Sequence, residues 1–287
     1  RRGETSRESS AGISFQGTHD EFSCPMNRNH PPLEMPPPDP VAGVPGPELQ
    51  LDRLSPLIRP AGKPRGYQSW RSLLFLHWPV PCDQLRPLVP EELSLDLYQD
   101  TAYLGIVLFG MQDVRHRSCP PFLSFNFLEA NVRTYVHYRG NPGIYFLSLD
   151  ANSRLAVWGA RTAWSLPYHH SRMEMRSGNG ETVFDIRRSS SSAFHRTRYR
   201  LGERLPPSEP GTLEHFLLER YWLFVRHHGR LCKAQVHHRP YPSQEAHLLE
   251  FEDQLRASAG LHELHGDPPL VHFSEGVDTE VFGLQTV

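Results

Sequence analysis

The chain has 287 residues, of which 38% are hydrophobic and 22% charged, and its 30 Lys and Arg nearly balance its 32 Asp and Glu. A balanced charge gives no basic surface for nucleic acid, and no apolar stretch approaches the roughly 20 residues of a membrane-spanning helix. The four cysteines are scattered without a CxxC pair, which excludes a zinc ribbon and a thioredoxin-type motif.

The first 60 residues differ in composition from the rest of the chain. Eight prolines fall within residues 31–47, and no apolar run follows a basic start as a secretory signal would require. Proline has no N–H to donate to a helix or a sheet, so such a stretch stays extended or disordered. We expect a disordered, proline-rich tail at 1–60 and a single domain at 61–287. A proline-rich ligand for a partner domain is the alternative for the tail.

From Tyr67 onward, short runs of aromatic and β-branched residues separated by turn signals predict strands. In chain order, the first half predicts a short helix broken by prolines at 81–93, two strands within 93–114 joined at 99–101, and a β-hairpin of 127–138 with 144–150 around a turn at 139–143. Residues 154–169 are compatible with a short helix or with a strand.

The second half of the chain adds strands and one clear helix. Residues 180–188 and 192–201 predict an antiparallel pair, and residues 231–241 a further strand. Thr212 is a typical N-cap, and the apolar spacing after it predicts a helix that ends at Gly229. Residues 243–260 are compatible with another helix. Together these elements predict an α+β fold that is mainly antiparallel β, with a few peripheral helices.

Polar side chains alternate along the strand predicted at 127–138. Glu129, Arg133 and Tyr135 share one face, because successive side chains of a strand point to opposite sides. This face either carries a surface ion-pair lattice or lines a cavity in which arginine presents a fork of donors to a carboxylate. In the second interpretation Glu129 and Tyr135 are candidate catalytic groups, as base and hydroxyl donor. A buried arginine needs an anionic partner, so we expect Arg133 to be buried, hydrogen-bonded to Glu129 or Asp150, beside a cavity that Tyr135 also lines.

With Arg133, three further residues are candidates for ligand binding. Asp150 ends the partner strand, Arg161 follows it closely, and His77 lies within an apolar run, where a core histidine is the alternative. Histidine doublets at 169–170, 227–228 and 237–238 could suggest a metal site, but adjacent residues of a strand point to opposite faces, so at most one of each pair could reach a shared ion. Surface or helix-end histidines are the favoured interpretation, and a metal site assembled from different doublets is the alternative. No motif for a nucleotide, a metal or an acyl-enzyme is present. We expect no metal and no cofactor.

Five long segments occur in a characteristic order: WRSLLFLHWPV (70–80), LRPLVPEELSLDLYQDTAYLGIVLF (85–109), NVRTYV (131–136), GIYFLSLDANSRLAVWGAR (143–161) and PPLVHFSEGVDTEVF (268–282). Together they resemble the bacterial family of domain of unknown function 2071, also called YqjF-like. The resemblance runs from about Tyr67 to Phe282 and leaves the tail unmatched. It implies an acetoacetate-decarboxylase-like fold, in which a strongly curved antiparallel sheet closes into a barrel around a central cavity. It implies no reaction, because the family has no established activity.

The number of lysines bears on the chemistry that this fold implies. Acetoacetate decarboxylases of similar fold use a Schiff-base lysine whose pKa is lowered by burial and by an adjacent lysine. This chain has only Lys63 and Lys233, so we expect no imine chemistry. We expect a cytoplasmic protein that binds a small molecule, an organic acid, with or without catalysis and without a nucleic-acid or membrane partner. The alternative is a lyase, hydratase or decarboxylase that uses Arg, Glu and Tyr in the cavity. The oligomeric state stays open.

Overall fold

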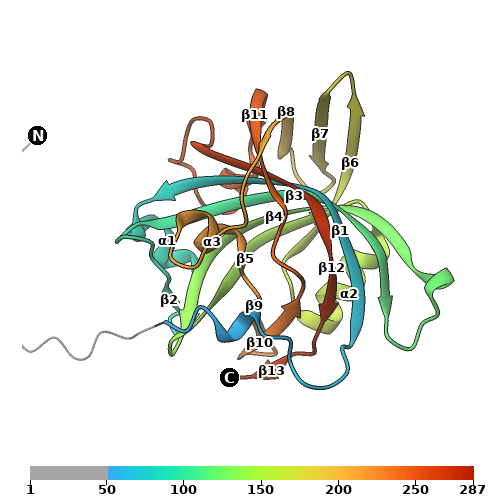
Figure 1. Cartoon of the computed structure of the whole chain (residues 1–287), viewed down its shortest axis with the longest axis vertical. Coiled ribbons are helices and arrows are strands. Elements are labelled where there is room, and N and C mark those ends of the chain that lie inside the picture. Colours follow the sequence, from blue (N-terminus) through green and yellow to red (C-terminus); the bar gives the residue numbers. More distant parts are fainter. Residues whose placement is uncertain (1–50) are drawn as a thin grey trace, which may run out of the picture. The chain divides into compact units, whose positions relative to one another are not determined.

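The computed structural model describes residues 51–287, in which one curved sheet of 13 strands dominates (Figure 1). The strands are β1 (Gly66–Val80), β2 (Ser94–Leu95), β3 (Ala102–His116), β4 (Phe125–Tyr138), β5 (Asn141–Ala151), β6 (Tyr168–Gly178), β7 (Glu181–Arg188), β8 (Phe194–Arg204), β9 (Trp222–His227), β10 (Arg230–His237), β11 (Ser243–Asp253), β12 (Leu270–Val281) and β13 (Gln285–Thr286). This is the mainly antiparallel α+β architecture that the sequence predicts. The hairpin β4–β5 and the pair β7–β8 confirm two of the strand predictions.

The helices are short and lie around the sheet. They are η1 (Ser55–Leu57), α1 (Cys82–Leu85), η2 (Arg86–Leu88), η3 (Pro121–Leu123), α2 (Arg154–Trp164), α3 (Leu213–Leu218) and α4 (Leu255–Ser258). The ambiguous stretch at 154–169 is therefore mostly helix. The Ser153 hydroxyl accepts a hydrogen bond from the Ala156 N–H at the start of α2, and Ser165 ends the helix in a left-handed conformation. Within residues 51–287, no helix is both long and apolar enough to cross a membrane.

The sheet closes on itself twice. Strands β5, β4, β3, β1 and β12 form a central sheet, and its two outer strands each pair with two different neighbours. On β5, Ile144 and Tyr145 pair with β9, whereas Leu149, Asp150 and Ala151 pair with β6. Likewise, one end of β12 pairs with β10 and the other with β11. One closure therefore runs through β9 and β10, and the other runs through β6, β7, β8 and β11.

Successive side chains of the central strands point to opposite faces of the sheet, so each of the two enclosed spaces is lined by a different set of side chains. One set of apolar residues forms a core with β6, β7, β8 and β11, together with the helices α1 and α4; it includes Leu74, Leu76, Ile106, Leu108 and Val132 from the central strands. The alternate residues point into the other space; they include Leu73, Phe75, Val107, Phe109 and Phe127. The central sheet is thus a wall between a packed core and a second space, which holds the candidate site.

Two helix predictions are wrong in part because strand pairing overrides a local helical pattern. The helix that begins after Thr212 ends at Leu218 rather than at Gly229. The residues that follow form β9, which pairs with β10 and in parallel with β5. Residues 243–253 form β11 rather than a helix, because they pair with β8 along most of their length, and only α4 follows. The first strand predicted within 93–114 shrinks to β2, which pairs with β4.

Residues 51–60 belong to the folded unit, so the predicted boundary at residue 60 is wrong. The Arg53 guanidinium donates two hydrogen bonds to the buried Asp96 carboxylate, at 2.8 and 2.6 Å. Pro56 is buried, and its carbonyl accepts a hydrogen bond from the Gln235 amide at 3.1 Å. Residues 1–50 of the predicted tail lie outside the described residues.

The Arg53 contact gives a test of how firmly this segment is held. Changing Arg53 to alanine should lower the free energy of unfolding by about 1.5–3 kcal/mol, because charged hydrogen bonds to a buried carboxylate are lost. Arg59→Ala is the matched control: Arg59 pairs with Glu280 at an exposed site, where a salt bridge contributes about 0–1 kcal/mol. Urea unfolding measures both. Equal losses in the two variants would mean that the Arg53 contact does not anchor the segment.

Candidate functional site

A cavity of about 520 Å³ lies in the space that β9 and β10 close. Strands β1, β3, β4 and β5 form its wall, and α2 lines another side of it. Most of the lining is apolar or aromatic, with Trp70, Phe75, Phe109, Phe127, Phe146 and Trp164 among the large side chains. The cavity has the size and the lining of a site for a small organic ligand, for which a few polar groups would fix the orientation.

Strand β4 supplies the main polar groups of the cavity. Glu129, Asn131 and Arg133 occupy alternate positions, so all three side chains point into the same space. The intervening Ala130 and Val132 pack in the core on the other side of the wall. Over four residues of strand, the Cα atoms of Glu129 and Arg133 lie about 13 Å apart. The cavity therefore has an acidic end and a basic end.

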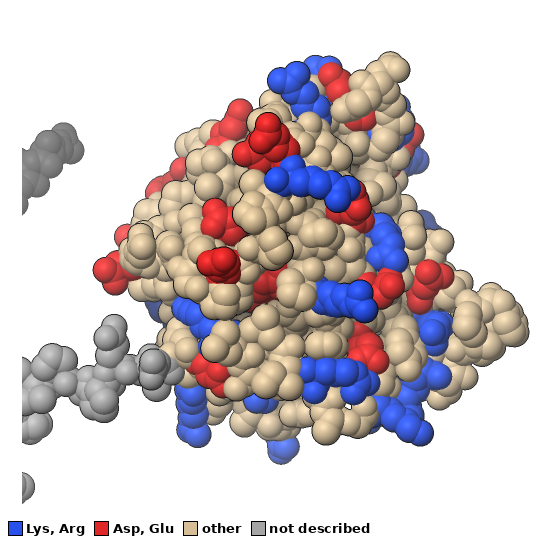
Figure 2. Space-filling model, viewed as in Figure 1, with Lys and Arg blue, Asp and Glu red and all other residues tan. Residues whose placement is uncertain are grey.

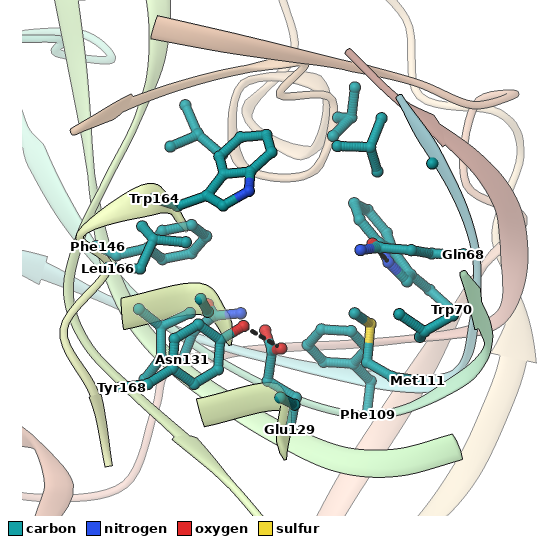
Figure 3. A pocket seen from close by; sticks show the side chains of 18 of the residues that line it. Gln68, Trp70, Phe109, Met111, Glu129, Asn131, Phe146, Trp164, Leu166 and Tyr168 are labelled. Atoms are coloured by element: carbon teal, nitrogen blue, oxygen red, sulfur yellow. Dashed lines mark hydrogen bonds between the residues drawn. The ribbon is translucent and has the colours of Figure 1, made fainter. Parts of the chain in front are cut away.

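Glu129 is a buried carboxyl group at the acidic end. The Tyr168 hydroxyl donates a hydrogen bond to its Oε2 atom at 2.6 Å, and Asn131 lies beside the pair (Figure 3). Burial raises the pKa of Glu129 from an ordinary value of 4.5 to about 7, although hydrogen bonds from Tyr168 and Asn131 act in the opposite direction. A carboxyl group with this pKa takes up and releases protons near neutral pH.

Arg133 is the charged group of the basic end and is only 7% exposed. Its Nη2 atom donates to the Leu217 carbonyl oxygen at 3.2 Å, and its guanidinium lies over the rings of Phe75 and Tyr135. No carboxylate among residues 51–287 pairs with it, and its Nε atom has no hydrogen-bond partner there. The expected pairing with Glu129 or Asp150 is therefore wrong, although Arg133 is buried beside the cavity.

Asp150 does not face the cavity, because Arg188 on β7 holds it. The Arg188 Nε and Nη2 atoms donate to the two carboxylate oxygens at 2.9 and 2.6 Å, and the Ser171 hydroxyl donates to Oδ1 at 2.5 Å. All of these side chains are buried. The structure therefore does not bring Asp150 into the cavity, and its carboxylate is engaged by Ser171 and Arg188.

Tyr135 and His77 lie near Arg133 but outside the cavity lining. The Tyr135 hydroxyl donates to the Leu217 carbonyl oxygen at 2.9 Å, so the prediction that this hydroxyl lines the cavity is wrong. His77 is fully buried, with neither ring nitrogen hydrogen-bonded within the described part of the chain. Burial holds the pKa of His77 well below its ordinary value, and the charge of Arg133 acts in the same direction. His77 is thus a neutral core histidine behind the basic end.

Arg161 lies on the exposed side of α2, where its Nε atom donates to the Tyr168 carbonyl oxygen at 2.7 Å. It is absent from the cavity lining, so the structure does not bring it together with Glu129 and Arg133. Several polar lining residues were missed, and Asn131 and Tyr168 are the two that lie beside Glu129. Alternation along β4 was enough to find Asn131. Tyr168 lies far from β4 in sequence, and only the parallel pairing of Leu149 with Tyr168 brings it to Glu129.

Neither lysine of the chain lines the cavity. Lys233 lies on β10, and its ammonium group packs over the Trp222 ring at 4.2 Å. Within residues 51–287, no group of three or more His, Cys, Asp or Glu side chains is placed to hold a metal ion. The chemistry that the cavity itself offers is a proton at Glu129, a positive charge at Arg133 and a largely aromatic wall.

Comparisons with known proteins identify relatives of this chain. The family model of DUF2071, described as an uncharacterised conserved protein, matches residues 67–278. Over 215 residues the chain is 37% identical to the uncharacterised protein YqjF of Bacillus subtilis, a match that covers 74% of this chain and 88% of that protein. The descriptions of the family and of YqjF name no activity.

Solved structures with the same fold include enzymes. The acetoacetate decarboxylase of Legionella pneumophila matches with a TM-score of 0.55 and 14% identity, over 79% of this chain and 88% of that one. The enduracididine biosynthesis enzyme MppR, in complex with a condensation product of pyruvate, matches with a TM-score of 0.55 and 12% identity, over 78% and 90%. These likenesses concern the fold alone, and they confirm the acetoacetate-decarboxylase-like fold.

Proposed function

This chain belongs to the DUF2071 family of uncharacterised conserved proteins, and we propose that its cavity binds a small organic acid whose carboxylate pairs with Arg133. The proposal concerns binding in the first place. It rests on the side chains of this cavity, because relatives of known activity share only the fold.

The charge of Arg133 carries the proposal. An arginine stays protonated even when buried, and a buried charge without a counter-charge costs several kcal/mol. Here the acids that were expected to balance it are engaged elsewhere, Glu129 by Tyr168 and Asp150 by Arg188. Arg133 has an unused Nε donor and lines the cavity. A ligand carboxylate is the group that would complete this site, since it can accept two hydrogen bonds from one guanidinium.

The rest of the cavity supports a ligand with an apolar body. Aromatic rings line the space between the two polar ends, and they would contact the body of the ligand over a large area. The amide of Asn131 lies between Glu129 and Arg133 along β4, and its Oδ1 atom has no partner within the described residues. A ligand with a hydroxyl or an amine would contact the Asn131 amide group, which lines the cavity. A ligand of this kind is an acid with a ring or a branched chain and one further polar group.

The variant Arg133→Met tests this proposal, because methionine keeps the apolar stem and removes the charge. We expect the affinity for organic acids to fall about 10- to 100-fold, the range for a charged hydrogen bond. The free energy of unfolding without ligand should not fall, because the variant removes a buried charge that has no carboxylate partner among residues 51–287. A thermal-shift screen of organic acids, followed by calorimetry, measures both quantities.

Two controls accompany this experiment. Arg161→Met removes an exposed arginine that is absent from the lining, and it should leave the affinity unchanged. The methyl ester of each acid that binds should bind weakly, since it lacks the carboxylate. The proposal would be overturned if the acids bound Arg133→Met as tightly as the native protein, or if esters and acids bound equally well.

A second function is favoured by Glu129. A carboxyl group with a pKa of about 7 in a cavity is suited to general acid–base catalysis. With Arg133 as the carboxylate site, Glu129 would move a proton at the distant end of the same ligand. The reaction would be that of a lyase, a hydratase or a decarboxylase that forms no imine. Glu129→Gln should then abolish turnover of the bound acid and leave its affinity within a few-fold. No turnover by the native protein would leave binding as the function.

A further inference from the structure

Exposed apolar side chains gather at the opening of the cavity. On α2, Leu155 is 63% exposed and Trp158 is 66% exposed, and both also line the cavity. The base of the β3–β4 hairpin lines the same cavity, and the tip of this hairpin carries Phe122 and Leu123, which are 83% and 60% exposed. Figure 1 shows the hairpin projecting from the sheet near α2. Large apolar side chains that gather on one exposed surface are typical of a site that contacts a partner.

The same segments carry positive charge. Arg65, Arg115 and His116 line the opening, and Arg117 and Arg154 lie beside it in sequence. In the space-filling view, blue side chains with red ones among them lie next to the projecting tan region that corresponds to the hairpin (Figure 2). No carboxylate of the described residues pairs with any of these arginines.

Acidic residues are scarce in the two segments that carry the exposed apolar side chains. Residues 114–128 and 151–173 contain no Asp or Glu. The nearest acid in the hairpin is Asp113, whose carboxylate accepts a hydrogen bond from the Ser124 hydroxyl. These two segments are therefore apolar at their projecting points and basic beside them, and the acids of the neighbouring β12, Asp278 and Glu280, are paired with Arg71 and Arg59.

The charge decides between two occupants of this surface. In a symmetric dimer the same patch meets itself, so the arginines of one copy would face those of the other, and like charges repel. An anionic membrane surface has the opposite charge, and its interface accepts Trp, Phe and Leu side chains. We expected no membrane partner because no segment spans a bilayer, but docking on a membrane surface requires no spanning segment.

We propose that the opening of the cavity docks on an anionic lipid membrane, with Phe122, Leu123, Leu155 and Trp158 in the interface and the flanking arginines on the headgroups. Docking in this position places the mouth of an apolar cavity against the bilayer. The proposal does not depend on the identity of the ligand, because it rests on the outer surface and not on Arg133.

Vesicle sedimentation with the full chain tests the docking. We expect the protein to sediment with vesicles of phosphatidylcholine and phosphatidylserine, not with phosphatidylcholine alone, and added salt should release it because salt screens exposed charges. The double variant Phe122→Ser, Leu123→Ser should bind the vesicles at least about tenfold more weakly, since it loses two apolar side chains that enter the interface. Leu201→Ser, on β8, is the matched control and should bind as the native protein does.

Three outcomes would overturn the proposal. The first is absence of binding to both kinds of vesicle, and the second is equal binding by the double variant and the native protein. The third is a native dimer that becomes monomeric in the double variant, as measured by light scattering. That result would assign the surface to self-association instead. Circular dichroism of each variant establishes that it is folded.

Discussion

Replacing Arg188 by alanine should destabilise the fold by about 3–5 kcal/mol, the cost of leaving one partner of a buried ion pair alone. Both side chains of the Arg188–Asp150 pair are buried, and two hydrogen bonds of 2.9 and 2.6 Å join them. Without Arg188, the Asp150 carboxylate would keep only the Ser171 hydroxyl as a partner. Urea unfolding of the native protein and of the variant gives the difference.

The Arg188–Asp150 ion pair also lies close to the residues that hold Glu129 in the candidate site. Asp150 lies next to Leu149, whose pairing with Tyr168 places that tyrosine beside Glu129. The control is Arg226→Ala, which removes an exposed partner of Glu92 and should cost about 0–1 kcal/mol. The double variant Asp150→Asn, Arg188→Met should recover part of the loss, because no buried charge remains. Similar losses in Arg188→Ala and Arg226→Ala would contradict this account of the pair.

The second large effect is a dependence of stability on pH that comes from Glu129. Its pKa is about 7 in the folded chain against an ordinary value of 4.5, so between these two values the folded state holds a proton that the unfolded state has lost. Stability is therefore greatest below pH 4.5 as far as this group is concerned, and it falls as the pH rises to about 7. The difference between these two pKa values corresponds to roughly 3 kcal/mol.

Glu129→Gln isolates this contribution, because glutamine is neutral and still accepts the Tyr168 hydrogen bond. Relative to the native protein, the variant should gain roughly 3 kcal/mol of stability as the pH rises from 4.5 to about 7. Other titrating groups, such as the buried His238, are present in both proteins and cancel in the difference. Urea unfolding at several pH values measures the two curves. Parallel curves would show that Glu129 is ionised throughout and is not buried as described.

The polar face of the cavity could be predicted in part because side chains alternate along a strand. This rule placed Glu129 and Arg133 on one face of β4, and both line the cavity. The rule says nothing about partners on other strands. Arg188 and Tyr168 reach Asp150 and Glu129 only through the pairing of β5 with β6 and of β6 with β7. The partner assigned to Arg133 was wrong for this reason.

The fold itself was predicted better than its details. Mainly antiparallel strands follow from aromatic and β-branched runs, and the resemblance to a family supplied the curved, closed sheet. The helix placed before Gly229 failed, because residues of β9 satisfy a helical spacing and also fit between β5 and β10. A local sequence pattern cannot decide whether these residues form a helix or a strand, since the outcome depends on pairing with strands that are distant in sequence.

A crystal structure with the tightest-binding organic acid tests the central claim most directly. We predict that the ligand lies in the cavity, with its carboxylate within hydrogen-bonding distance of the Arg133 guanidinium and its apolar body against the aromatic wall. A ligand bound to the arginines outside the opening, or bound in the cavity with its carboxylate away from Arg133, would contradict the account.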